Sequence, residues 1–275
     1  LQGSFFSHQQ SVVKMKYIID RFRAWNRNRI NLRRLLKPPQ KTPLGFSMKG
    51  PPYIFDDTWG VHEIKLLRKL LSRSQRFINV GANVGIYVLL ARQLGLSVTA
   101  IEPVPQTVQF LLENLELNLL SDHVTVIPAA AGNVAGVAKI YGVGTGASLL
   151  KTWGDNPETS SQRIPVICLD DVISMPKEKE QLLILVDVEG FEYQALLGAK
   201  NLMAARPRPI WIVEMIIENM GTAQNCSAAD SFSLFINSGY SAKCINPTMT
   251  HTNNPIQGVS NYVFFDQDLD IDSII

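Results

Sequence analysis

The stretch that decides the fold is Phe77-Ile78-Asn79-Val80-Gly81-Ala82-Asn83-Val84-Gly85. A short apolar run ends at Gly81, and a helical pattern begins directly after Gly85. A glycine at such a turn lets the backbone bend sharply and lets a ligand approach, because no Cβ intervenes. Strand, glycine loop and helix in this order predict one unit of an open α/β sheet, in which ligands lie at the carboxyl ends of the strands.

Strands and helices alternate along the rest of the chain. We expect helices over 60–72, 84–94, 106–118, 192–202 and 228–238. We expect strands over 76–80, 97–101, 123–127, 137–142, 163–169, 182–186, 209–213, 240–245 and 261–265. This alternation predicts a mostly parallel sheet covered by helices on both faces. A Pro/Gly-rich stretch near residue 50 predicts two parts, which are a basic helical arm with a linker (1–50) and one α/β domain (51–275).

Composition excludes several classes of protein. The chain has 275 residues, of which 46% are hydrophobic and 18% charged, so it is neither disordered nor a small disulfide scaffold. No apolar run reaches the roughly 20 residues that cross a bilayer. Three Cys without C-x-x-C spacing argue against a zinc site and for a reducing compartment, so we expect a cytoplasmic protein. The chain begins with Leu1, which predicts processing or excision from a longer polypeptide.

The net charge of +2 conceals an asymmetry. Residues 10–41 hold ten basic side chains and one acid, giving +9, whereas the remainder holds 16 basic and 23 acidic residues, giving −7. Such an arm could lie on its own protein, on a partner copy, on an anionic membrane surface or on nucleic acid. We favour packing on the main domain or on a partner copy.

The second predicted strand limits the classes of ligand that the site could bind. It ends at Glu102, 17 residues after Gly85. An acid at this place accepts hydrogen bonds from the two vicinal hydroxyls of a ribose. The glycine spacing is G-x-x-x-G instead of the dinucleotide G-x-G-x-x-G, which leaves room for a cationic amino-acid tail in place of a pyrophosphate. The pattern therefore favours S-adenosylmethionine over NAD.

Acidic residues follow the next two strands. Asp187, Glu189 and Glu192 come directly after the apolar run 182–186, and Glu214 ends the strand after it. Asp187 is placed to approach a methyl donor or an acceptor hydroxyl. Glu192 has a second interpretation, because an acid at a helix start stabilises that helix. Four carboxylates at one sheet edge could hold a divalent cation, but no His stands at useful spacing, so we do not favour a metal.

These residues resemble the FkbM-type S-adenosylmethionine-dependent methyltransferases over roughly 60–265. The resemblance rests on the stretches 77–85, 100–103, 168–172, 187–192 and 196–199, with 209–214 and 238–240. It implies a Rossmann-like class I methyltransferase fold, whose seven-stranded sheet has one antiparallel strand. It also implies O-methylation of a sugar, glycan or natural-product hydroxyl, with S-adenosylhomocysteine as product. Two residues depart from the family pattern, since Asn79 and Leu185 stand where the family has Asp and often Lys.

The sequence therefore gives a set of candidate site residues. The catalytic candidates are Asp187, Glu189, Glu192 and Glu214, with His62 and His251 as alternative bases. The cofactor-binding candidates are Asn79, Gly81, Ala82, Asn83, Gly85, Tyr87, Glu102, Pro103, Ala130 and Asp187. The acceptor-binding candidates are Ser148, Trp153 and Glu189.

Two other functions remain open at this point. A nucleic-acid methyltransferase would use the basic arm, and its binding would weaken steeply with salt. A non-catalytic adapter would use the fold, with or without the cofactor, for assembly on a larger polypeptide. For the enzyme itself we expect a hydroxylated small-molecule or glycan acceptor and, as a further possibility, a homo-oligomer.

Overall fold

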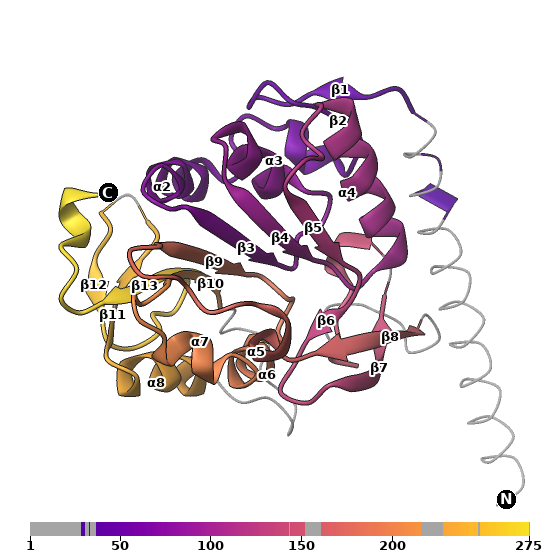
Figure 1. Cartoon of the computed structure of the whole chain (residues 1–275). Helices are drawn as coiled ribbons and strands as arrows, with labels where there is room; N and C mark the ends of the chain where they lie inside the picture. Colours follow the sequence, from indigo (N-terminus) through magenta and orange to yellow (C-terminus); the bar gives the residue numbers. More distant parts are fainter. Residues whose placement is uncertain are drawn as a thin grey trace, which may run out of the picture.

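The computed structural model describes residues 29, 30, 33, 37–142, 144–151, 161–215, 228–246 and 248–274. Its centre is an eight-stranded sheet with the order β12-β11-β13-β10-β9-β3-β4-β5 (Figure 1). The strands are β3 (Arg76–Val80), β4 (Ser97–Ile101), β5 (Val124–Ile127), β9 (Leu182–Val186), β10 (Ile210–Glu214), β11 (Tyr240–Cys244), β12 (His251–Thr252) and β13 (Asn261–Asp266). The helices are α2 (Val61–Leu71), α3 (Ile86–Gln93), α4 (Pro105–Leu117), α5 (Leu169–Val172), α6 (Glu192–Leu197), α7 (Lys200–Ala204) and α8 (Ala228–Asn237).

The strand directions confirm the predicted fold class. β5, β4, β3, β9 and β10 are parallel to one another, whereas β13 is antiparallel to both β10 and β11. Seven strands with one antiparallel member are thus the class I methyltransferase sheet, and the two-residue strand β12 extends its edge. β3 lies between β4 and β9, so the loops that follow these three strands meet at one edge of the sheet.

Alternating side chains of the central strands build two cores. In β3, Phe77 packs in the core beneath α2, α3 and α4, whereas Ile78 and Val80 pack in the core on the other face, with α6, α7 and α8. Figure 1 shows these two groups of helices on opposite faces of the sheet. Because successive side chains of a strand point to opposite faces, a strand buried on both faces is apolar throughout.

Part of the predicted linker packs on the domain. Residues 40–50 contain strands β1 (Gln40–Lys41) and β2 (Ser47–Met48), and the Phe46 and Met48 side chains are buried in the core. The Lys49 amide donates a hydrogen bond to Asn114 Oδ1 at 2.8 Å, which ties this segment to α4. The division at residue 50 stays a prediction, and most of the basic segment 10–41 lies outside the described residues.

The predicted helix over 192–202 is two helices, α6 and α7, and this prediction was wrong in its continuity. Gly198 lies between them, and a Cβ there would stand 2.1 Å from the Gly132 carbonyl oxygen. The helix is interrupted at Gly198, because the absence of a side chain there lets two backbone segments come into contact. The helical pattern of 192–202 therefore spans two helices.

The added strands predicted near 137–142 and 163–169 form a second, three-stranded sheet with the order β6-β8-β7. Its members are β6 (Ala130–Ala131), β7 (Gly136–Tyr141) and β8 (Ser161–Ile167).

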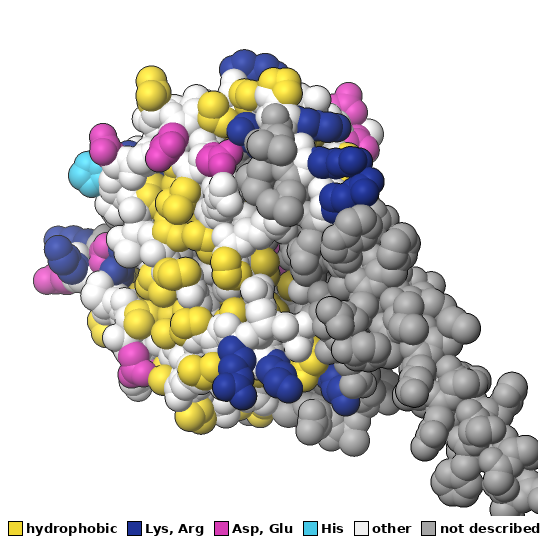
Figure 2. All heavy atoms as spheres, turned by 90° about the vertical axis from the view of Figure 1, so that its right-hand side faces the viewer, with side chains coloured by type: hydrophobic (Ala, Val, Ile, Leu, Met, Phe, Trp, Pro, Cys, Tyr) yellow, Lys and Arg dark blue, Asp and Glu magenta, His cyan; other side chains and the backbone are white. Residues whose placement is uncertain are grey.

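Figure 2 shows the right-hand side of Figure 1, where Lys and Arg gather at the upper and lower edges with hydrophobic side chains between them. Across the described residues, no helix is long and apolar enough to cross a membrane.

Candidate functional site

The loop after β3 presses against the end of β9. Gly81 has a φ of +82°, and a Cβ there would lie 1.7 Å from the Asp187 carbonyl oxygen. The Asp187 amide donates a hydrogen bond to the Val80 carbonyl at 2.9 Å. Gly85 also has a positive φ, and a Cβ there would meet Leu111 Cδ1 at 2.3 Å. Gly81 is therefore required because two sheet loops approach each other closely there. Gly85 is required because α3 approaches α4 closely there.

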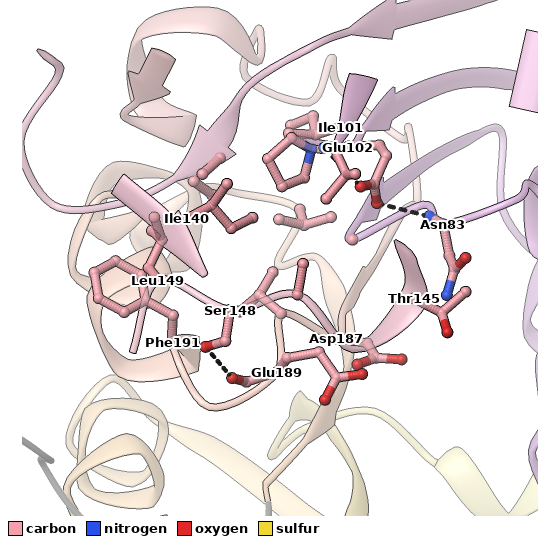
Figure 3. Close-up of a pocket in the computed structure, with 18 of the residues that line it drawn as sticks. Asn83, Ile101, Glu102, Ile140, Thr145, Ser148, Leu149, Asp187, Glu189 and Phe191 are labelled. Carbon is pink, nitrogen blue, oxygen red and sulfur yellow. Dashed lines mark hydrogen bonds between the residues drawn. The ribbon is translucent and has the colours of Figure 1, made fainter. Parts of the chain in front are cut away.

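Glu102 is held by the backbone around it. It lies at the end of β4, is 6% exposed, and accepts hydrogen bonds from the Asn83 amide at 3.0 Å and the Val104 amide at 2.9 Å (Figure 3). Burial raises the pKa of Glu102 to about 7, although the two hydrogen bonds act in the opposite direction. Each oxygen accepts one backbone hydrogen bond, and the carboxyl group lines a cavity. The group is thus fixed in place to receive a further donor.

That first cavity has two different ends. Figure 3 shows Ile140, Leu149 and Phe191 gathered at one end, and Glu102 and Asp187 toward the other. Ala129, Ala130 and Ala131 also line this cavity. A cavity that is apolar at one end and acidic at the other suits a ligand with a flat apolar group attached to a polyol.

A second cavity adjoins the first and shares part of its lining. Asn83, Thr145, Asp187 and Glu189 line both cavities, so these residues form the boundary between them. Glu214 lines only the second. A group transferred between ligands in the two cavities would pass this boundary.

Asp187 and Glu214 form a carboxyl pair. Burial, followed by the charge of Glu214 and the hydrogen bond between the two side chains, raises the pKa of Asp187 well above its ordinary value. Burial also raises the pKa of Glu214. Both shifts favour the protonated form, and each group contributes to the shift of the other, so the two carboxyl groups are coupled.

Ser148 fixes the turn that carries Glu189. Glu189 has a φ of +55°, which is uncommon for a residue with a side chain. The buried Ser148 hydroxyl donates a hydrogen bond to the Glu189 carbonyl at 2.7 Å and accepts one from the Leu150 amide at 3.0 Å. Ser148 also lines the first cavity, but its hydroxyl is engaged with the backbone (Figure 3).

Glu192 belongs to the same turn and lines neither of the two cavities. Its Oε1 accepts hydrogen bonds from the Gly190 amide at 3.0 Å and the Val188 amide at 3.2 Å. Burial raises the pKa of Glu192 to about 7. This geometry fits a residue that positions Glu189 through the turn and does not itself reach a ligand.

The other candidates divide between the cavities and the surrounding frame. The cofactor candidates that line the first cavity are Gly81, Asn83, Glu102, Pro103, Ala130 and Asp187. Tyr87 lines the second cavity, while Asn79, Ala82 and Gly85 line neither. The side-chain amide of Asn79 is fully buried and has no hydrogen-bond partner among the described residues.

Three further candidates lie away from the cavities or cannot be placed. Trp153 lies outside the described residues. His62 is exposed, and the exposed His251 ring lies 3.9 Å from Asp272, so neither of the alternative bases lines the two cavities.

Sequence reasoning missed one wall of the second cavity. Tyr53, Trp59 and Glu63 line it together with Tyr87. Ring centroids are 5.0 Å apart for Tyr53 and Trp59 and 6.0 Å apart for Trp59 and Tyr87. Asn83 Nδ2 donates a hydrogen bond to the Tyr53 hydroxyl at 3.2 Å, which joins this wall to the β3 loop. The only sequence signal was the presence of two large aromatic residues in and beside a Pro/Gly-rich stretch.

A metal centre has no structural counterpart in the part of the chain that is described. No group of three or more His, Cys, Asp or Glu side chains there is arranged to hold an ion.

Comparison with known proteins gives a family and a set of similar structures. Residues 79–235, more than half of the chain, match the family described as methyltransferase FkbM domain. A search of curated proteins found none that matches. Similar solved structures include precorrin-6y C5,15-methyltransferase from Geobacter metallireducens, with 12% identity, coverage of 80% of this chain and 94% of that one, and a TM-score of 0.46. Magnesium protoporphyrin IX methyltransferase from Synechocystis PCC 6803 has 10% identity, coverage of 91% and 97%, and a TM-score of 0.45.

Proposed function

The chain belongs to the FkbM methyltransferase family, and from this premise we propose that it methylates a hydroxyl of a sugar, glycan or natural-product acceptor. The methyl donor is S-adenosylmethionine. The observation that carries the proposal is the position of Asp187, which lines both cavities and is paired with Glu214 in the second one.

The first cavity fits the cofactor. Glu102 is fixed by two backbone amides and presents a buried carboxylate to the cavity, as two vicinal ribose hydroxyls require. Gly81 lines the cavity and lets the β3 loop pack against Asp187, where a Cβ would clash. The apolar end, with Leu149 and Phe191, suits the adenine ring.

Methyl transfer needs alignment and a proton acceptor. S-adenosylmethionine supplies an electrophilic methyl group, whose bond to sulfur breaks as its bond to the acceptor oxygen forms, leaving S-adenosylhomocysteine. Holding two reactants in line can contribute about 7–11 kcal/mol. The acceptor hydroxyl loses its proton in this step. We assign that proton to the Asp187–Glu214 pair, and such help is typically worth about 10²–10⁴-fold.

Asp187→Asn tests the assignment. The variant should lose at least about 100-fold in turnover, because an amide cannot take the proton, while its affinity for S-adenosylhomocysteine stays within about threefold. Calorimetry measures the affinity, and an acceptor screen with deoxysugar glycans and macrolides measures turnover. The exposed Asp122→Asn is the matched control and should behave like the unchanged protein. Near-normal turnover in Asp187→Asn would remove this residue from the mechanism.

The charge of the second cavity weighs against a nucleic-acid acceptor. Its described lining contains Glu63, Asp187, Glu189 and Glu214 and no Lys, Arg or His, whereas phosphate binding depends on basic groups. An adapter function would instead be indicated by cofactor binding without turnover on every acceptor screened.

A further inference from the structure

The second cavity has an aromatic wall. Tyr53, Trp59 and Tyr87 all line it, and Trp59 stacks on Tyr87 with an angle of 18° between the ring planes. Each of the three rings is partly exposed, so their remaining surface is open to a ligand. Aromatic faces carry negative electrostatic potential and attract a cation held within about 6 Å.

The remainder of the cavity is acidic. Glu63, from the first turn of α2, faces the same space as the Asp187–Glu214 pair. Three acidic residues, Glu63, Asp187 and Glu214, therefore line this one cavity. Among the described lining residues there is no Lys, Arg or His to balance them. Closing a neutral ligand over such charges would cost free energy, because buried charges need partners.

We propose that this cavity selects an acceptor that carries an ammonium group beside the hydroxyl to be methylated, as in an amino alcohol or an amino sugar. The proposal rests on the methyltransferase function proposed above and specifies its substrate class. The ammonium group lies against the aromatic wall and Glu63, and the hydroxyl lies toward Asp187. An acceptor with a carboxylate or phosphate at the same place is excluded by repulsion.

Binding of two matched probes tests this selection without requiring turnover. The probes are choline and its uncharged isostere, in which carbon replaces the nitrogen, and both are titrated into the full chain saturated with S-adenosylhomocysteine. Choline should bind at least about tenfold more tightly than the isostere, because the two probes differ only in charge. Glu63→Gln should reduce choline affinity about three- to tenfold and leave the isostere unchanged. Glu116→Gln, an exposed acid on α4, is the control for overall charge and should leave both affinities unchanged.

Each outcome decides the matter. Equal affinities for the two probes, tighter binding of the isostere, or no binding of either one overturns the proposal. So does a choline affinity that is the same in Glu63→Gln as in the unchanged chain. Failure of S-adenosylhomocysteine to bind is a separate result, which would count against the proposed methyltransferase function itself.

Discussion

The protonation state of Glu102 should set the affinity for the cofactor. The pKa of this carboxyl is raised to about 7 by burial, and ribose hydroxyls donate hydrogen bonds to its ionised form. If only the ionised form binds, the apparent Kd rises by the factor 1 + 10^(7 − pH). S-adenosylhomocysteine should therefore bind about 11-fold more weakly at pH 6 than at its high-pH limit, and about twofold more weakly at pH 7.

Stability of the ligand-free protein should change in the opposite direction. The raised pKa means that the folded chain holds a proton that the unfolded chain has lost between about pH 4.5 and pH 7. The free energy of unfolding therefore falls as the pH rises through this window. At about 1.36 kcal/mol for each unit of pKa, the contribution of Glu102 is of the order of 3 kcal/mol.

Titration calorimetry from pH 5.5 to pH 8.5 measures the affinity directly. Glu102→Gln should bind roughly 10- to 100-fold more weakly at pH 8, from the loss of charge-assisted hydrogen bonds, and its affinity should lose most of the pH dependence. Glu192→Gln is the matched control, because the pKa of Glu192 is also raised to about 7 but this residue lines neither cavity. Equal Kd values at pH 6 and pH 8, or the same profile in Glu102→Gln as in the unchanged protein, would refute the reasoning.

Three substitutions test the frame around the site, with urea unfolding as the measurement. Gly81→Ala should lower the free energy of unfolding by more than about 3 kcal/mol. Gly95→Ala, which has a similar φ but open space around its Cβ position, should lower it by only about 1–2 kcal/mol. Equal losses would contradict the clash between a Cβ at position 81 and Asp187. Ser148→Ala should lower the free energy of unfolding by about 1–3 kcal/mol, because the Leu150 amide loses its hydrogen-bond acceptor. If Ser148 instead bound the acceptor, the substitution would change KM and leave stability unchanged. Asn79→Leu should keep or raise stability, because the Asn79 amide makes no hydrogen bond to any described residue, and a loss above about 2 kcal/mol would contradict this.

The sheet was predictable because its strands are short apolar runs that end at polar or glycine residues. The observed bounds of β3, β4 and β9 equal the predicted ranges 76–80, 97–101 and 182–186. Their polar ends also fall at one sheet edge, as the parallel connection predicts. The sequence could not reveal that Gly81 touches Asp187, since this contact depends on the pairing of β3 with β9.

The missing parts of the site come from long-range packing. Tyr53 and Trp59 face Asp187 only because α2 and the segment before it lie over the carboxyl ends of the strands, and no local pattern encodes that placement. Glu192 was ambiguous for the opposite reason. An acid after a strand end fits both a site residue and a helix-start residue, and only its hydrogen bonds to 188 and 190 separate the two.

Two of the three aromatic rings of the second cavity come from a short stretch of the chain that does not line the first cavity. Tyr53 and Trp59 precede β3, whereas Glu102 and the glycine loop follow β3 and β4. Mutations in 52–60 can therefore retune molecular recognition while the nucleoside half is inherited unchanged. Evolution could diversify such a catalyst by varying a short entrance segment, and a protein engineer could graft that segment to redirect it.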